Sequence, residues 1–373
     1  MTLTAPSPIY QALGLAAQAL FVSNPNPRVG CVITAPDGEV LGEGFTQQAG
    51  GPHAEVMALR AAQAAGHDVR GATAYVTLEP CAHQGRTGPC CDALIAAGIG
   101  KVVASVEDPN PLVAGQGFAR LRAAGVAVEV GPGAQESREL NIGFFSRMVR
   151  GTPWVRLKVA ASLDGTMALH NGASQWITSP ASRADGHAWR ARACAVLTGI
   201  GTVLADNPLL NVREVATPRQ PHLVIVDSRL QTPPGASLFI AGRACYIYFA
   251  APIDAEIEAR RQALEERGAT VVHLPGADGR VDLAALLRDL APRGVNELHV
   301  EAGHRLNGAL LREGLVDELL LYQAPRLLGP GYGMLRIEPL ETLSQGLALD
   351  FHGVERVGPD LRVLARVQGR DRF

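Results

Sequence analysis

Apolar positions in the first 150 residues switch between helical and extended spacing. A helical period runs through Ile9, Leu13, Ala16 and Leu20, and the Asn-Pro-Asn-Pro run at 24–27 ends the helix it predicts. β-type runs at 28–34 and 39–45 flank Asp37 and Gly38, a pair typical of a hairpin turn. Further helices are predicted at 53–65, 90–97, 116–124 and 140–150, and further strands at 74–78, 101–106 and 126–130. This alternation predicts an open sheet packed between helices.

The rest of the chain alternates in the same way. Strands are predicted at 155–160, 195–197, 222–226, 245–249, 270–273 and 297–300, and helices at 180–193, 254–267, 281–290 and 306–313. Two more runs, 316–324 and 360–367, look like strands of a mixed edge. The Gly-Thr-Pro joint at 151–153 is the best boundary, so we expect two α/β domains, residues 1–145 and 151–373.

Composition narrows the function classes. Of the 373 residues, 47% are hydrophobic and 19% charged, which is typical of a chain that buries real cores. The net charge is −2, and residues 1–145 hold 8 basic and 12 acidic groups, or −4, so no basic patch indicates nucleic-acid or membrane binding. No apolar run reaches the roughly 18–20 residues of a membrane helix, and the opening lacks a secretory pattern. Only six cysteines occur, so we expect a cytoplasmic protein with reduced thiols.

One group of residues carries the chemistry of a zinc site. His53 and Glu55 stand at a predicted helix start, and Cys81 and Cys90 follow downstream. One imidazole and two thiolates leave the fourth position of a tetrahedral zinc ion open to water, whose pKa then falls toward about 7. Glu55 can move a proton from that water to a departing amine. The pattern matches the signature of zinc nucleobase deaminases, except that eight residues rather than two separate the cysteines.

The second cysteine ligand has rivals. Cys91 and His83 also lie in this segment, but Cys90 follows Gly88 and Pro89 at the helix mouth and is favoured. Alternatively, the histidine caps a helix and the cysteines belong to the core. Because the residues occur together with Glu55 and two prolines, the zinc interpretation is the stronger one.

The C-terminal half lacks a dinucleotide-binding fingerprint, because Leu204 stands where the third glycine would be. Two Gly-containing turns, at 197–202 and 300–308, would each present backbone N–H groups at a helix N-terminus, as a pyrophosphate requires. Plain strand-to-helix turns are the alternative.

Both halves resemble one known family, the bifunctional riboflavin-biosynthesis deaminase/reductases. The motifs that carry the resemblance lie at 24–30, 51–55, 80–95 and 107–115, and at 157–165, 174–179, 201–208, 226–228 and 300–308. The resemblance implies a cytidine-deaminase-like three-layer domain followed by a dihydrofolate-reductase-like domain that uses NADPH. It also implies hydrolytic deamination of a diaminohydroxypyrimidine that carries a phosphoribosylamino group, and then reduction of the ribosyl chain to ribityl. Thr46 and Met57 stand where the family commonly has histidines.

The resemblance also implies roles for single residues. Asn24 is similar to a substrate contact of the deaminase. Cofactor contacts are implied for Ala160, Trp176, Thr202, Asp206, Ser228, Gly303, His304, Arg305, Leu306, Asn307 and Gly308, and substrate contacts for Ser174, Arg190, Leu210, Arg213 and Glu301. Lys158 and Glu301 are the polar side chains expected at the reacting carbon. Arg190 and Arg213 offer guanidinium groups suited to a ribose phosphate, although surface charge is the alternative for either.

Two other functions fit the sequence less well. A nucleic-acid-editing zinc deaminase with a C-terminal binding module is disfavoured by the acidic first half and by few aromatic residues. A reductase whose deaminase half is only structural is disfavoured by the intact set His53, Glu55, Cys81 and Cys90. We therefore expect a zinc- and NADPH-dependent enzyme, a homo-oligomer acting on a small molecule, with no nucleic-acid or membrane partner.

Overall fold

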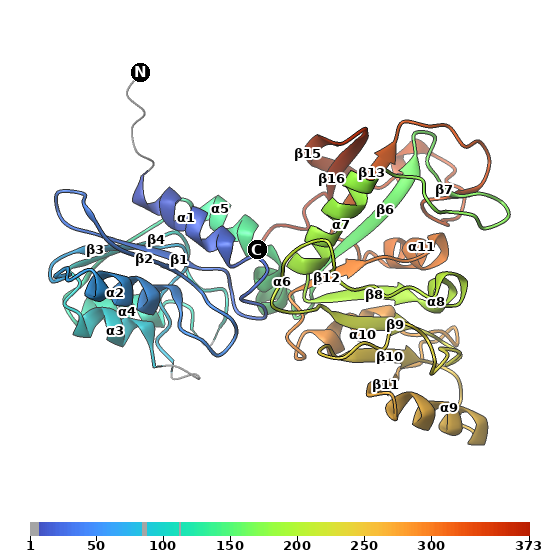
Figure 1. Ribbon diagram of the computed structural model, residues 1–373, viewed down its shortest axis with the longest axis horizontal. Helices are drawn as coiled ribbons and strands as arrows, with labels where there is room; N and C mark the ends of the chain where they lie inside the picture. The colour runs from blue at the N-terminus through green and yellow to red at the C-terminus, as the bar shows by residue number, and fades with distance from the viewer. Residues whose placement is uncertain (1–6, 84–87, 112) are drawn as a thin grey trace. The chain divides into compact units, whose positions relative to one another are not determined.

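The predicted alternation of helices and strands is present in both parts of the computed structural model, which describes residues 7–83, 88–111 and 113–373 (Figure 1). The chain divides into two units, Met1–Gly151 and Thr152–Phe373. The opening residues used above to judge a secretory signal, and residues 84–87 of the cysteine segment, lie outside the described residues. Within the described ranges, every helix is too short or too polar to cross a membrane.

The first unit is a three-layer α/β domain. Its five-stranded sheet has the order β2-β1-β3-β4-β5, in which β1 runs antiparallel to both β2 and β3, whereas β3, β4 and β5 are parallel. Helices α1 and α5 cover one face, and α2, α3 and α4 cover the other (Figure 1). The elements are α1 Pro8–Gln18, β1 Gly30–Thr34, β2 Val40–Phe45, α2 Ala54–Ala64, β3 Thr73–Val76, α3 Cys90–Ala96, β4 Lys101–Ala104, α4 Gln116–Ala123, β5 Ala127–Val130, α5 Ala134–Leu140 and α6 Ile142–Arg150.

Glycines let the helices approach this sheet closely. A Cβ on Gly30 of β1 would lie 1.9 Å from the Ala12 carbonyl oxygen of α1, and one on Gly42 of β2 would lie 2.3 Å from that of Ala58 in α2. The helix faces opposite are alanine-rich, so backbone packs against backbone. This packing fixes where α2 begins and therefore where His53 stands.

The helix predicted at 140–150 is present as α6, which begins at Ile142, and α5, which was not predicted, precedes it. The break falls at Asn141, whose side chain accepts from the backbone N–H of Arg28 (2.7 Å) and donates to the Arg28 carbonyl (2.9 Å). An Asn that pairs with a distant backbone segment competes with helical continuity, which apolar spacing does not reveal.

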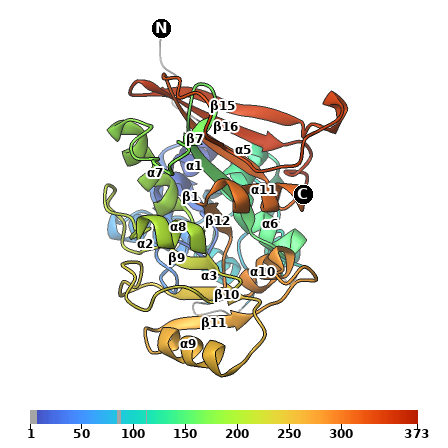
Figure 2. The same cartoon turned by 90° about the vertical axis from the view of Figure 1, so that its right-hand side faces the viewer.

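The second unit is built on a nine-stranded sheet, β11-β10-β9-β8-β12-β6-β13-β16-β15. The strands from β11 to β13 are parallel. β13 and β16 pair antiparallel as the predicted mixed edge, and β15 adds to β16, also antiparallel. Figure 2 shows β15 and β16 at one end of this sheet and β11 with α9 at the other. The strands are β6 Trp154–Ser162, β8 Ala195–Gly199, β9 His222–Val226, β10 Cys245–Phe249, β11 Ala269–His273, β12 Glu297–Val300, β13 Glu318–Ala324, β15 Leu349–Val357 and β16 Asp360–Val367.

The remaining elements connect these strands. The helices are α7 Pro180–Arg192, α8 Ile200–Asp206, α9 Ala255–Glu265, α10 Leu283–Leu290 and α11 His304–Arg312, with a 3₁₀ turn η1 at Leu343–Gln345. A small separate pairing joins β7 Thr166–Ala168 to β14 Tyr332–Gly333. Apolar periodicity did not predict β15, because nearly all of its residues are exposed.

Around β12, β6 and β13 the two faces of this sheet differ in polarity. Leu157, Leu197 and Leu298 pack into an apolar cluster with α10 and α11. On the other alternation, Arg156 of β6 donates to Glu297 of β12 (2.9 Å) and to Glu318 of β13 (2.5 Å), with all three side chains buried. The same alternation places Lys158 midway along β6 and Glu301 just beyond β12, so both lie level with the carboxyl end of β12. Open α/β sheets bind ligands at the carboxyl ends of their strands.

Candidate active sites

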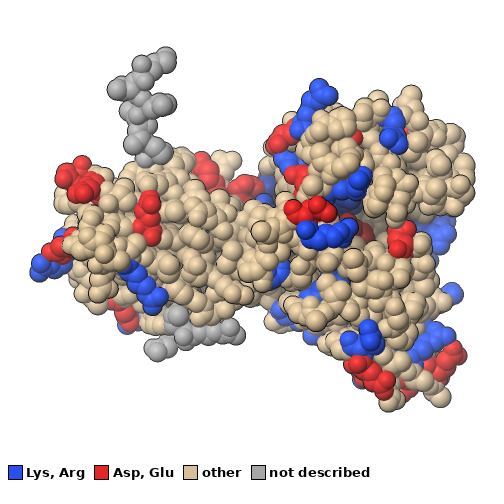
Figure 3. Space-filling view, in the orientation of Figure 1, with Lys and Arg blue, Asp and Glu red and all other residues tan. Residues whose placement is uncertain are grey.

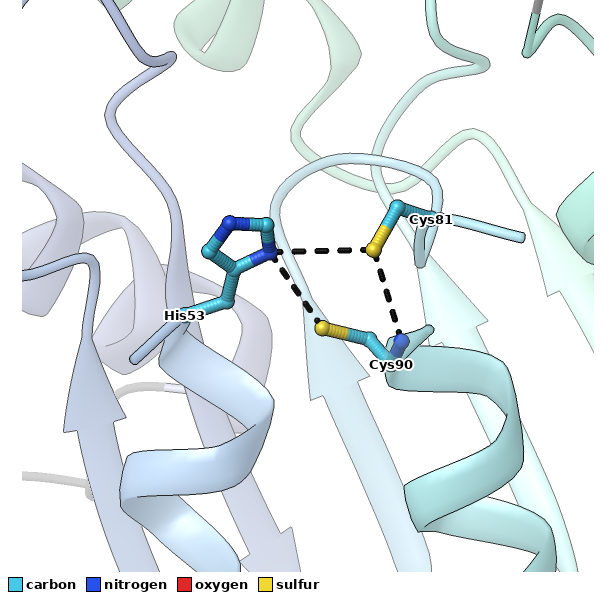
Figure 4. Close-up of side chains that lie close together, drawn as sticks. All are labelled: His53, Cys81 and Cys90. Atoms are coloured by element: carbon cyan, nitrogen blue, oxygen red, sulfur yellow. Dashed lines mark hydrogen bonds between the residues drawn. The ribbon is translucent and has the colours of Figure 1, made fainter. Parts of the chain in front are cut away.

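Three predicted metal ligands converge in the first unit. His53 is the N-cap of α2, Cys90 is the first residue of α3, and Cys81 lies in the segment after β3. Their side chains point toward one another in Figure 4. The His53 Nδ1 atom lies 3.7 Å from the Cys81 Sγ and 3.4 Å from the Cys90 Sγ, and all three donor atoms fall within 4.8 Å of each other. One nitrogen and two sulfurs at this spacing fit a zinc ion that keeps an open position.

The surroundings favour sulfur in its anionic form. The pKa of Cys81 falls to about 4, chiefly because the Cys90 thiol hydrogen-bonds to it, with further help from His53 and the Cys90 backbone N–H. The same shared proton raises the pKa of Cys90. Since a metal ion displaces such protons, a preformed thiolate beside an imidazole suits zinc.

The rival ligands lie elsewhere. The Cys91 thiol donates to the Pro80 carbonyl oxygen at 3.0 Å and is buried. His83 is exposed and does not belong to the cluster of donor atoms. The structure therefore brings together His53, Cys81 and Cys90, and turns Cys91 into a packing residue.

Glu55, the predicted proton carrier, lies beside these three residues. It is the second residue of α2 and only 3% exposed. Burial raises its pKa to about 7, and the negative charge of Cys81 adds to that effect. A carboxyl group that takes up and releases a proton near neutral pH suits general acid–base work.

A further carboxylate, Glu79, was missed by the sequence reasoning. It is buried two residues before Cys81 and accepts backbone N–H groups from Gly117 (2.8 Å), Phe118 (3.2 Å) and Asp108 (3.1 Å). It therefore fastens the cysteine segment to the start of α4. In the sequence, Glu79 is marked only by its place before the Pro-Cys pair at the end of a strand.

Three other positions that the resemblance singled out lie on or between elements of the first unit. Asn24 is half-buried in the segment between α1 and β1. Thr46 is buried directly after β2, where its N–H donates to the Val29 carbonyl oxygen at 2.9 Å. Met57 lies on α2, and a Cβ on Gly44 of β2 would approach its Cβ to 2.5 Å.

The second unit contains a cavity of about 1270 Å³. The predicted contacts that line it are Lys158, Ala160, Ser174, Trp176, Arg190, Thr202, Asp206, Leu210, Arg213, Ser228, Glu301, Gly303, His304, Arg305 and Leu306. Asn307 and Gly308 are not among the lining residues. Asn307 donates to the Met334 carbonyl oxygen at 3.2 Å. A Cβ on Gly308 would lie 2.0 Å from the Arg336 carbonyl oxygen, so both residues pack against residues 334–336.

The cavity fits a dinucleotide together with a substrate. Its volume exceeds the 300–1,000 Å³ typical of a site for one small ligand. At Gly201 and Gly303 an added Cβ would meet no atom within 4 Å, so backbone is open to the cavity there. Arg280, Arg305 and Arg312 also line it and supply guanidinium groups for phosphates.

An ionic cluster lies in the wall of the cavity. Arg190 grips Glu301 through Nε and through Nη2, the latter at 2.8 Å, and its Nη1 donates to the Asn211 carbonyl oxygen at 3.0 Å. The Lys158 Nζ lies 3.9 Å from a Glu301 oxygen. Burial alone would raise the pKa of Glu301, but Arg190 and Lys158 hold it well below its usual range. Burial lowers the pKa of Lys158.

The two predicted phosphate-binding arginines thus differ. The three donor nitrogens of Arg190 are directed to Glu301 and Asn211. Arg213 is exposed and uses Nη1 on the Asn211 side chain at 2.9 Å. Its fork is the more available of the two for a ligand.

Trp176 lines the cavity and is exposed. It is 61% exposed, and the Arg183 guanidinium carbon stands 4.5 Å from the centre of its ring. Ser179 caps α7 by accepting from the Ser182 N–H, with Pro180 at the first helical position.

Comparisons with known proteins agree with both sites. Residues 8–106 match the cytidine and deoxycytidylate deaminase zinc-binding region, and residues 153–363 match the RibD C-terminal domain. The riboflavin biosynthesis protein RibD of Escherichia coli is 45% identical over 94% of this chain and 96% of its own length. A structure of Acinetobacter baumannii RibD has a TM-score of 0.86 and 42% identity, and covers 97% of this chain and 98% of its own.

A third relative carries a longer name. A structure from Thermotoga maritima, described as a diaminohydroxyphosphoribosylaminopyrimidine deaminase/5-amino-6-(5-phosphoribosylamino)uracil reductase, has a TM-score of 0.83 and 33% identity. It covers 96% of this chain and 97% of its own.

Fold and sites together define a zinc-dependent deaminase joined to a dihydrofolate-reductase-like NADPH reductase. The chain belongs to the RibD family of riboflavin biosynthesis proteins. The predicted fold class, bifunctional enzyme and cofactors are confirmed, and the nucleic-acid-editing alternative is not supported. Consistent with this, acidic and basic groups are scattered among uncharged ones on the face of the first unit drawn in Figure 3.

Proposed function

We propose that this chain deaminates 2,5-diamino-6-(5-phosphoribosylamino)pyrimidin-4-one and then reduces the ribosyl side chain of the product to ribityl. The observation that carries the proposal is the convergence of His53, Cys81 and Cys90 beside buried Glu55, in one chain with the Lys158–Glu301–Arg190 cavity. The name of the Thermotoga maritima relative supports this choice of substrate.

In the first reaction, His53, Cys81 and Cys90 would hold the zinc ion, and the zinc would supply the Lewis acidity that lets water ionise near neutral pH. Glu55 takes a proton from the attacking water and passes it to the departing amine. A C–O bond forms at the ring carbon, the C–N bond breaks, and ammonia leaves. The raised pKa of Glu55, about 7, suits both halves of this transfer. Asn24 binds the substrate.

In the second reaction, NADPH would supply the hydride that forms the new C–H bond at the ribosyl C1, while the ring C1–O bond breaks and its oxygen takes up a proton. Lys158 donates the accompanying proton, since it is the ammonium group that faces the cavity beside Glu301. Glu301 and Arg190 hold it in place, and Arg213 binds the ribose phosphate with Ser174 and Leu210 alongside. Ala160, Trp176, Thr202, Asp206, Ser228 and residues 303–306 contact the cofactor.

We assign the deaminase to residues 1–145 and the reductase to residues 151–373. We further propose that the enzyme is a cytoplasmic homo-oligomer. Light scattering of the purified chain tests the assembly, and a mass equal to one chain at micromolar concentration would contradict it.

The decisive experiment pairs metal analysis with a coupled assay. Purified protein should contain about one zinc per chain, release ammonia from the diaminopyrimidine, and oxidise NADPH only after that release. Chelation should stop ammonia release while NADPH oxidation with the deaminated substrate continues. Full-rate ammonia release from zinc-depleted protein would overturn the proposal.

A further inference from the structure

Tyr322 lies beside Lys158 without a role in the chemistry described above. It stands on β13, whose parallel register sets Tyr322 opposite Ala160 and Leu320 opposite Lys158 of β6. It is 1% exposed, yet it lines the same cavity. A buried tyrosine hydroxyl beside the reacting groups suggests a proton donor.

The hydroxyl group of Tyr322 is already committed. It donates to the Asp185 Oδ2 of α7 at 2.5 Å. Asp185 in turn accepts two hydrogen bonds from the Arg362 Nη1, at 2.9 and 3.0 Å. These hydrogen bonds fix the plane of the phenol ring and direct its hydroxyl proton toward Asp185, which is not among the residues that line the cavity.

The ring face, in contrast, is turned to the ammonium group. The Lys158 Nζ lies 5.9 Å from the centre of the Tyr322 ring, within the range in which an aromatic face attracts a cation. The other partner of Lys158 is Glu301, at 3.9 Å, and both oxygens of that carboxylate are also gripped by Arg190. A flexible four-carbon side chain with one shared carboxylate needs a second contact to hold a single position.

We propose that Tyr322 is a positioning residue of the reductase, which holds the Lys158 ammonium group against Glu301 by its ring face while Asp185 locks the ring through the hydroxyl. The inference rests on the proposed function, because it acts through the proton that Lys158 donates. It assigns the ring, rather than the hydroxyl, to the reaction.

The sign of the expected pH effect follows from the groups around Lys158. Glu301 favours the ammonium form, Arg190 opposes it, and buried His299, whose pKa is lowered to about 3, is neutral in the working range. The ring face favours the ammonium form. Loss of the ring therefore lowers the pKa of Lys158, and the alkaline fall of kcat moves to lower pH.

The test measures NADPH oxidation by the full-length zinc enzyme with the deaminated substrate. Tyr322→Leu should lower kcat about tenfold and move the alkaline limb of kcat down by about half a pH unit, with KM for NADPH unchanged. Tyr322→Phe keeps the ring and should retain kcat within about threefold. The matched control is Tyr246→Leu. Tyr246 lies on β10, is not among the residues that line the cavity, and has the Arg293 guanidinium carbon 4.8 Å from the centre of its ring. This variant should leave both values unchanged.

A second comparison decides the matter if the Leu variant does not fold. Pentafluorophenylalanine at position 322 has the shape of Phe but a ring face that no longer attracts cations, so its alkaline limb should lie below that of Tyr322→Phe. Equal limbs for these two variants, or equal kcat for Tyr322→Phe and Tyr322→Leu, would overturn the positioning role. Absence of NADPH oxidation in the unaltered enzyme would instead overturn the proposed function.

Discussion

The zinc cluster takes its side chains from residues 53–90, and two of its ligands stand at or beside the first residue of a helix. The reductase cavity draws on residues 158–332, from β6, β13, α7 and the turns after β8 and β12. In the first site, the starts of two helices and close glycine–alanine packing fix the positions of the zinc ligands. In the second, position is maintained by ion pairs that join several strands. A local change should therefore disable the zinc site without unfolding it, whereas the reductase should respond through stability as well as chemistry.

The largest expected effect tests the first half of this comparison. Glu55→Gln removes the proton carrier but not a zinc ligand, so ammonia release should fall by about 10²–10⁴-fold with zinc content unchanged. NADPH oxidation with the deaminated substrate should remain at the level of the unaltered enzyme. Both rates are measured on one preparation, and a parallel fall of both would show that the two sites do not act separately.

The next prediction tests the second half. Arg156→Met strands two buried carboxylates, Glu297 and Glu318, and should destabilise the second unit by about 3–5 kcal/mol, although Arg192 and Arg366 still contact them. The measurement is the midpoint temperature of reductase inactivation, with that of the deaminase followed in the same sample. The control is Arg261→Met, which breaks an exposed 3.0 Å pair with Glu265 on α9 and should cost less than about 1 kcal/mol.

If Arg156→Met lowered the inactivation midpoint of the deaminase as much as that of the reductase, the two units would unfold together as one cooperative unit. If it lowered neither, the buried charges would not be holding the sheet, and the contrast between the two sites would fail.

The same contrast explains how far sequence reasoning reached. The residues of the zinc cluster were predictable because a fixed spacing of His, Glu and Cys has few other uses. The sequence also favoured Cys90 over Cys91, and the contact of Cys91 with Pro80 agrees with that choice. The parallel strands of the second unit were predictable from their continuous apolar runs. In contrast, Glu79 and Tyr322 act through partners more than 25 residues away, so no local pattern marks them.

Elements that bury little were also missed. β15 exposes most of its residues, so it has no apolar alternation to detect, and α5, of which only Ser137 is buried, was not predicted either. For the cavity, the motif at 300–308 mixes residues that face the ligand space with Asn307 and Gly308, which pack against residues 334–336. A contiguous motif does not separate these two tasks.

A paired substitution sharpens the picture of the zinc site. Cys90→Ser should lower zinc affinity by about a hundredfold or more, beyond the 10–100-fold cost of losing an outer partner, and ammonia release should fall with it. Cys91→Ser should keep zinc and activity, because a serine hydroxyl can also donate to the Pro80 carbonyl oxygen. Zinc is measured by competition with a chromogenic chelator. Loss of zinc from Cys91→Ser with retention in Cys90→Ser would reverse the ligand assignment.

The smallest expected effect sets the two units against each other in acid. Burial raises the pKa of Asp108 in the first unit to about 6, above the roughly 3.9 of an unfolded chain, so the folded state binds its proton more tightly. Its contribution to stability is therefore greatest below about pH 4 and is lost as the pH rises through about 6, by at most about 2 to 3 kcal/mol. Glu301 in the second unit behaves oppositely, because its pKa is held below the unfolded value. Its contribution to stability is lost only as the pH falls below about 4.3.

The test compares the unaltered enzyme with Asp108→Asn. The difference between their deaminase inactivation midpoints should change between pH 6.5 and 4.5, while their reductase inactivation midpoints stay equal. A difference that did not vary with pH would remove Asp108 as the source.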